Sequence, residues 1–149
     1  MSAMPTLSEA AILALHAVAL LAIRQGRCVQ SREMASTLGA SQAHLSKVLQ
    51  RLTKVGILRS IRGPKGGFVL ANGARDTTLL DVYETIDGPL PRHSCLLGTP
   101  VCLGKGCVMG GLVAAINQQI REHLSGTRIS QLSEIEWKPN SHTQMEERP

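Results

Sequence analysis

Three cysteines, Cys95, Cys102 and Cys107, share one short stretch of the chain, with six residues between the first two and four between the second two. Thiolates are soft ligands that suit iron–sulfur clusters and zinc. In a reducing compartment, grouped thiols more often bind a metal or act as a redox switch than form a disulfide framework. The stretch therefore predicts a metal site or a redox switch.

The spacing of these thiols favours an iron–sulfur cluster over zinc, and zinc over a metal-free thiol switch. Zinc sites usually contain a close Cys-x-x-Cys pair, which this sequence lacks, whereas a widely spaced loop can wrap around a larger group. Cys107 also precedes an expected helix, and a helix N-terminus favours the thiolate that binds metal. A fourth ligand is needed, for which the candidates are Glu9, His93 and His123.

A loop and two helices must position the cysteines. Residues 88–106 contain three prolines and several glycines without a periodic pattern, which predicts a long loop. Thr78 is the expected N-cap of a helix over residues 79–87 before this loop. After the loop, apolar residues at helical spacing predict a helix from Val108 to about Leu124. The polar residues 138–149 are expected to be a disordered tail.

The first half of the chain predicts a winged helix-turn-helix. Three helices are expected, in this order: from a cap at Thr6 or Ser8 to residue 24, from a cap at Ser31 to residue 38, and from a cap at Ser41 to residue 55. Ala35 is small where two helices cross, and Gly39 supplies the left-handed turn between them. Two strands, 57–61 and 68–71, then flank a Gly- and Pro-rich tip and form a wing. The expected fold class is mostly α, with a small two-stranded β wing and a long C-terminal helix.

The charge of the chain is divided unevenly between its two halves. Residues 1–75 carry ten Lys and Arg against two acidic residues, a net charge of +8, whereas residues 76–149 carry six against nine, a net charge of −3. The basic half is therefore expected to meet a polyanion. Only three residues are aromatic, which excludes modules that stack single-stranded bases on aromatic side chains.

Double-stranded DNA is the polyanion that this pattern favours. A recognition helix presents polar side chains from its N-terminal end to base edges, and the candidates are Ser41, Gln42, His44, Lys47 and Arg51. The candidates on the wing are Arg59, Arg62 and Lys65. Gln42 suits adenine, Lys47 or Arg51 suits guanine or phosphate, and Arg62 at the wing tip suits the minor groove. Taken singly, each feature also fits a solvated face of ordinary three-helix packing, but together they favour DNA binding.

Enzymes and membrane proteins are not favoured. The sequence shows no nucleophile–base pair and no phosphate-binding loop. The apolar run over residues 10–23 is too short to span a bilayer and lacks the basic flank of a signal peptide. We therefore expect a cytoplasmic protein without a membrane segment or catalytic site.

Two motifs carry a resemblance to a known family. The first is the wing sequence Arg59-Ser-Ile-Arg-Gly-Pro-Lys-Gly-Gly-Phe, and the second is Thr78-Leu-Leu-Asp-Val-Tyr-Glu-Thr-Ile-Asp-Gly-Pro, followed by the three cysteines and a long helix. Over residues 4–135 the chain resembles the bacterial winged-helix regulators typified by IscR and NsrR. The resemblance implies a homodimeric repressor of transcription at a palindromic DNA operator. Operator binding would be controlled by a [2Fe-2S] cluster, or alternatively a [4Fe-4S] cluster, that senses redox state, nitric oxide or iron–sulfur status.

The same resemblance assigns roles to residues of this sequence. Cys95, Cys102 and Cys107 hold the cluster, residues 108–124 form the dimerisation helix, and Arg62 is the minor-groove residue. Some members use a His three residues after the last Cys as fourth ligand, but that position is Gly110 here. Others use an acidic residue near the start of the first helix, donated by the partner subunit, and that position is Glu9. The expected division is a DNA-binding domain over 1–77, a cluster and dimerisation region over 78–137, and the tail.

Overall fold

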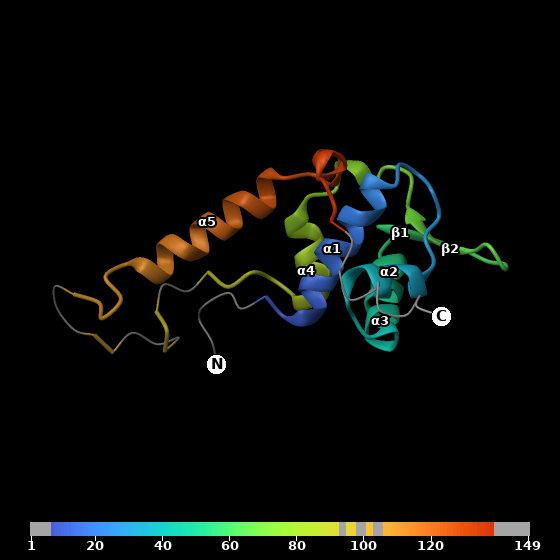
Figure 1. Ribbon diagram of the computed structural model, residues 1–149. Helices are drawn as coiled ribbons and strands as arrows, with labels where there is room; N and C mark the ends of the chain where they lie inside the picture. Colours follow the sequence, from blue (N-terminus) through green and yellow to red (C-terminus); the bar gives the residue numbers. More distant parts are fainter. Residues whose placement is uncertain (1–6, 93–94, 98–100, 103–105, 139–149) are drawn as a thin grey trace.

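The computed structural model describes residues 7–92, 95–97, 101–102 and 106–138 (Figure 1). Its elements follow the chain in the order α1 (Glu9–Ile23), α2 (Ser31–Leu38), α3 (Gln42–Lys54), β1 (Leu58–Ile61), β2 (Gly67–Leu70), the 3-10 helix η1 (Ala74–Asp76), α4 (Leu79–Asp87), α5 (Leu112–Gly126) and the 3-10 helix η2 (Ile129–Glu134). The mostly helical architecture with a two-stranded wing confirms the fold class expected from the sequence.

Helix α1 is the centre of the structure, and α2, α3, α4, β2 and η2 all contact it. The small residues Ala11, Ala14 and Ala17 are completely buried, which allows the neighbouring helices to approach closely. Ser8 is the N-cap of α1, and its hydroxyl accepts a hydrogen bond from the Ala11 amide at 3.0 Å. Of the two residues that the sequence offers for this cap, Thr6 and Ser8, the structure therefore has Ser8 in that role.

The helix-turn-helix forms as the sequence predicts. Gly39 ends α2 with a φ of 64°, in the left-handed region that glycine adopts at low cost. Ala35 is 5% exposed, and Leu45 of α3 is completely buried in the same core. The start of α2 differs from the prediction, because Gln30 rather than Ser31 is the N-cap residue and its side chain makes no capping bond.

The wing is an antiparallel hairpin in which Leu58 pairs with Leu70 and Ile61 with Gly67. It is joined to the turn before α2 by two hydrogen bonds between Val29 and Phe68, of 3.0 and 2.8 Å. Gly67 allows this approach, because a Cβ there would lie 2.3 Å from the Val29 carbonyl oxygen. The wing therefore has a fixed position relative to the helix-turn-helix.

Helix α4 has the bounds that the sequence predicts, whereas α5 begins four residues later than expected. Thr78 and Asp81 form a capping box at the start of α4. Gly110 and Gly111, with φ of 57° and 82°, delay α5 until Leu112. From α4, α5 extends away from the helical body, while η2 returns to the side of α1 and η1 (Figure 1).

The loop expected over residues 88–106 contains no helix or strand in the parts that the structure describes. His93 and residues 139–149 lie outside the described residues, so the expected ligand role of His93 and most of the expected tail stay predictions. Among the described helices, none is long and apolar enough to cross a membrane.

Candidate functional site

Helix α3 presents one polar face to solvent. Its N-terminus is fixed by Ser41, whose hydroxyl accepts a hydrogen bond from the His44 amide at 3.4 Å. The apolar side of the helix is buried at Leu45, Val48, Leu49 and Leu52. The opposite side is exposed at Ala43, Lys47, Gln50 and Lys54, and Gln42 at the first turn is also exposed. This arrangement fits insertion into a major groove. It also makes Gln50, which lies near Lys47 at helical spacing, a further candidate for DNA contact.

Arg51 differs from the other predicted DNA contacts on α3. Its guanidinium donates hydrogen bonds to the backbone carbonyls of Thr85, at 3.1 Å, and Ile86, at 2.9 Å. Both carbonyls belong to the last turn of α4. Arg51 is exposed to solvent, but its guanidinium is thus engaged within the protein, a role that sequence spacing alone could not indicate.

The wing exposes Arg62 and Lys65 at its tip, where the sequence predicts DNA contacts. The tip is held by Gln30, whose side-chain amide donates to the Pro64 carbonyl at 3.2 Å. It is also tightly folded, because a Cβ at Gly66 would lie 2.1 Å from the carbonyl oxygen of Ile61. The two basic side chains therefore extend from a well-positioned backbone.

Arg59 lies away from the tip, in the middle of β1 opposite Val69. It lines an open pocket of about 620 Å³ that also includes Arg75, Asn72 and Ser130. The structure therefore places Arg59 beside η1 and η2 at the base of the wing, and separates it from the tip residues.

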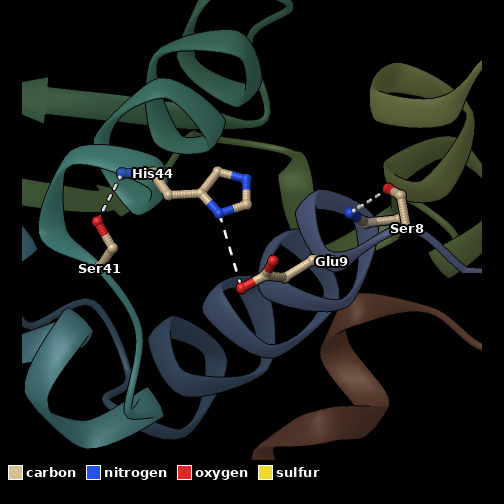
Figure 2. A network of polar contacts seen from close by, with 5 residues as sticks. Ser8, Glu9, Ser41 and His44 are labelled. Atoms are coloured by element: carbon tan, nitrogen blue, oxygen red, sulfur yellow. Dashed lines mark hydrogen bonds and ion pairs between the residues drawn. The ribbon is translucent and has the colours of Figure 1, made fainter.

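The start of α1 faces the start of the recognition helix. Glu9 Oε1 lies 3.8 Å from His44 Nδ1, and the two side chains point toward one another from α1 and α3 (Figure 2). The Glu9 side chain is 79% exposed and the His44 side chain 36% exposed. Two residues predicted for different tasks, cluster binding and DNA reading, are therefore neighbours.

Asp87 at the end of α4 anchors this part of α1. Its carboxylate accepts hydrogen bonds from the Ser8 amide, at 3.2 Å, and from the Ser8 hydroxyl, at 2.5 Å. A carboxylate at a helix N-terminus is also favoured by the helix dipole. The position of Glu9 thus depends on the Asp87-Gly-Pro corner that the sequence contains.

Tyr83, one turn earlier in α4, is nearly buried at 3% exposure. Burial raises the pKa of its phenol above the usual value of 10.0, and the nearby carboxylates of Asp87 and Glu84 raise it further. The phenol is therefore held in its neutral form beside the acidic end of α4.

The segment that leads to the cysteines is attached to both α4 and α5. The Leu90 amide donates to Glu84 Oε1 at 3.1 Å, and the Leu90 carbonyl accepts from the Arg121 guanidinium at 2.9 Å. The Leu90 side chain is buried in the core. A displacement of this segment would therefore disturb its hydrogen bond to Glu84 near the end of α4.

The cysteines themselves are accessible to different extents. Cys102 and Cys107 are exposed, Cys95 is half-buried, and none of the four cysteines forms a disulfide. Cys107 Sγ accepts a hydrogen bond from the Met109 amide at 3.4 Å. The sequence predicted that Cys107 lies at the N-terminus of the helix. This prediction was wrong, because α5 begins only at Leu112 and Cys107 lies in the turns before it.

The described residues do not bring a set of metal ligands together. Within them, no group of three or more His, Cys, Asp or Glu side chains is arranged to hold a metal ion. His123, the other ligand candidate, is exposed in the last turn of α5. The ligand roles of Cys95, Cys102, Cys107 and Glu9 thus stay predictions.

Comparison with known families identifies the chain. Residues 7–135 match the model of the Rrf2 family, which is described as "Iron-dependent Transcriptional regulator". The chain belongs to the Rrf2 family. Its winged helix, basic wing tip and exposed recognition helix are therefore those of a transcription regulator, and the family assignment implies DNA binding rather than enzymatic activity.

Relatives of this Rrf2 protein include other regulators. It is 31% identical over 134 residues to a protein of Aquifex aeolicus that carries the description HTH-type transcriptional regulator, covering 88% of this chain and 93% of that protein. It is also 31% identical over 91 residues to the regulator IscR of Klebsiella pneumoniae strain 342, covering 59% and 52%.

Solved structures support the same fold. CymR of Bacillus subtilis, described as its global cysteine regulator, superposes with a TM-score of 0.66 at 25% identity, covering 87% of this chain and 97% of that one. IscR of T. potens superposes with a TM-score of 0.62 at 20% identity, covering 93% and 96%. The latter likeness concerns the fold alone.

The cysteine chemistry of this Rrf2 protein fits an iron-containing group. Thiols outside disulfides are soft donors of the type that binds iron, and a backbone N–H donated to Cys107 Sγ is the kind of contact that stabilises charge on a cluster-bound sulfur. The donor types therefore suit a cluster, but the described residues form no group of three or more ligands.

Proposed function

We propose that this Rrf2 protein is a homodimeric repressor whose affinity for a palindromic operator is set by an iron–sulfur cluster. Cys95, Cys102 and Cys107 would hold the cluster, with Glu9 of the partner subunit as the fourth ligand. Bound there, the cluster would supply a centre that reacts to oxidants, nitric oxide or iron supply. The observation that carries the proposal is the three-cysteine segment attached, through Leu90, to the same turn of α4 that holds the start of α1 and the recognition helix.

DNA contact in this proposal is divided between α3 and the wing. From the exposed side of α3, Gln42 and Gln50 contact base edges in the major groove, and Lys47 contacts a base or a phosphate. Arg62 enters the minor groove beside it, and Lys65 contacts phosphate. In a dimer, two such units lie about 34 Å apart on one face of the duplex, which requires an operator with two-fold symmetry.

Helix α5 is the proposed dimer contact. It contacts α4, and its buried residue Leu124 belongs to the core that also contains residues of α4. Leu112 remains 51% exposed on another side of the helix, where an apolar residue gains about 1.5 to 3 kcal/mol from complete burial. A second copy of α5 would cover this side.

The residues around Glu9 suggest how a change at the cysteines reaches DNA. Glu9 lies beside His44 of α3, and Ser8 next to it is held by the end of α4. If the Glu9 carboxylate moved away from His44, the recognition helix would lose this contact with the start of α1. A coupling of only about 1.4 kcal/mol between the two sites changes operator affinity tenfold.

A thiol switch without a cluster is the second candidate. It is favoured by the exposure of Cys102 and Cys107, and by the finding that the described residues form no group of three or more metal ligands. In this case an oxidant would act directly on the thiols. A zinc-bound regulator is the third alternative, and it would be colourless.

Anaerobic purification separates the candidates. Visible absorption, iron and acid-labile sulfide are measured for the wild-type protein and for Cys95→Ala, Cys102→Ala and Cys107→Ala. Cys28→Ala is the matched control, because Cys28 lies between α1 and α2, far in the chain from the other three cysteines. The proposal expects the absorption to be lost in the three variants and retained in the control. Zinc without sulfide, or metal-free protein, would favour the alternatives.

A further inference from the structure

Two residues on one flank of α3 contact the rest of the protein. His44 and Arg51 are seven residues apart, which places them on nearly the same side of a helix with 3.6 residues per turn. His44 lies beside Glu9 of α1, and Arg51 donates to the backbone of α4. This flank borders the exposed face that contains Lys47 and Gln50, and Arg51 is itself exposed to solvent.

The hydrogen bonds of Arg51 satisfy the end of α4. The last carbonyls of an α-helix have no partner within the helix. The Glu84 carbonyl accepts from the Gly88 amide at 3.0 Å, and one Arg51 nitrogen serves both Thr85 and Ile86. A cation at this position is also favoured by the negative end of the helix dipole.

The same turn of α4 is attached to two other parts of the chain. The Asp87 carboxylate holds Ser8 at the start of α1, and the Glu84 carboxylate holds the Leu90 amide at the entrance to the cysteine segment. Arg51 thus joins the recognition helix to the turn on which these segments meet.

We propose that Arg51 is a positioning residue that fixes the recognition helix on the end of α4, and that it is not a phosphate or base contact. Its two carbonyl acceptors help to set the angle at which α3 packs against α4, and so the angle at which Lys47 and Gln50 meet the groove. A change in the last turn of α4 would reach α3 by this route. The inference rests on the proposed operator binding.

Salt dependence distinguishes a positioning residue from a phosphate contact. Each phosphate that a protein neutralises contributes about 0.9 to the slope of log affinity against log salt. Operator affinity is measured between 50 and 200 mM salt (about the usual range) for the wild-type chain, Arg51→Gln and the comparison variant Lys47→Gln. Lys47 is exposed one turn before Arg51.

We expect Arg51→Gln to lower operator affinity about tenfold with an unchanged salt slope. Its melting temperature should fall by about 3 to 8 °C, because two carbonyls lose a charged donor. Lys47→Gln should lower the slope by about one and leave the melting temperature unchanged. A slope reduced by about one in Arg51→Gln with an unchanged melting temperature would overturn the inference, and so would a variant identical to wild type.

A second variant and the behaviour of the wild-type protein complete the test. If Arg51→Gln does not fold, Arg51→Lys replaces it, because lysine keeps the charge that a phosphate contact needs but ends one bond short of the α4 carbonyls. A lower melting temperature and weaker binding at the wild-type slope then support positioning, whereas full retention of both contradicts it. Wild-type protein that binds no operator would instead refute the proposed function.

Discussion

Glu9 Oε1 and His44 Nδ1 lie 3.8 Å apart, so the first turn of the first helix touches the first turns of the recognition helix. Ser8, the residue before Glu9, is held by the carboxylate of Asp87. The acidic residue that the family resemblance assigns to the cluster is therefore also a neighbour of the DNA-reading element.

This contact predicts energetic coupling between Glu9 and His44. Glu9 and His44 form an ion pair only when the imidazole is protonated, and exposed ion pairs are worth about 0.2 to 1 kcal/mol. Under those conditions the effects of Glu9→Gln and His44→Gln on operator affinity should deviate from additivity by up to that amount. A double-mutant cycle measured by fluorescence anisotropy checks this expectation. Strict additivity would mean that the two side chains act independently.

Glu9→Gln should also change how firmly the metal centre is held if Glu9 is a ligand. We expect faster loss of visible absorption on exposure to air, because an amide binds iron more weakly than a carboxylate. Glu33→Gln is the matched control, since Glu33 lies in α2 and pairs with Arg24 at 3.6 Å. Equal loss rates in the two variants would remove Glu9 from the ligand set.

Arg62→Ala should weaken operator binding and lower its salt slope by about one, because one guanidinium leaves the DNA. Arg75→Ala is the control, because Arg75 is an exposed arginine of η1 that lines the pocket at the base of the wing. It should change neither quantity. If the two variants behave alike, the wing tip does not contact DNA.

Leu112→Asp should convert the dimer to a monomer, because a charge would be placed on the apolar side of α5 that α4 leaves exposed. Ala114→Asp adds the same charge about 200° further round the helix, also at an exposed position. Sedimentation analysis should show a monomer for the first variant and a dimer for the second. A dimer in both would refute α5 as the contact.

The raised pKa of Tyr83 makes stability depend on alkaline pH. Above pH 10.0 the unfolded chain releases the phenolic proton while the folded chain retains it, so the free energy of unfolding falls as the pH rises. Below that pH the contribution is fully present. Denaturant unfolding between pH 8 and 11 (roughly the accessible window) should show a steeper loss for wild type than for Tyr83→Phe. Parallel curves would contradict this assignment.

The sequence predicted those parts of the fold whose signals are local. Helix α4 begins and ends as expected because Thr78 and Gly88 mark both of its termini. The start of α5 was wrong by four residues, since apolar spacing continues through Val108 while the Gly110–Gly111 pair turns the backbone. The short helix η1 was not expected at all.

The site was predicted less completely, because its contacts join distant parts of the chain. The exposed face of α3 follows from helical periodicity, and the wing tip follows from its Gly and Pro content. The hydrogen bonds of Arg51 to α4 and the approach of Glu9 to His44 cross 34 residues or more. No local pattern carries such information, so neither contact was expected from the sequence.

Operator affinity with and without the metal centre tests the central claim most directly. A DNA fragment selected from a random pool by the anaerobic protein is titrated with that protein, and again after its metal has been removed by a chelator. We predict at least a tenfold difference in affinity, corresponding to about 1.4 kcal/mol or more. Equal affinities for the two forms would contradict the proposal that the cysteine segment controls DNA binding.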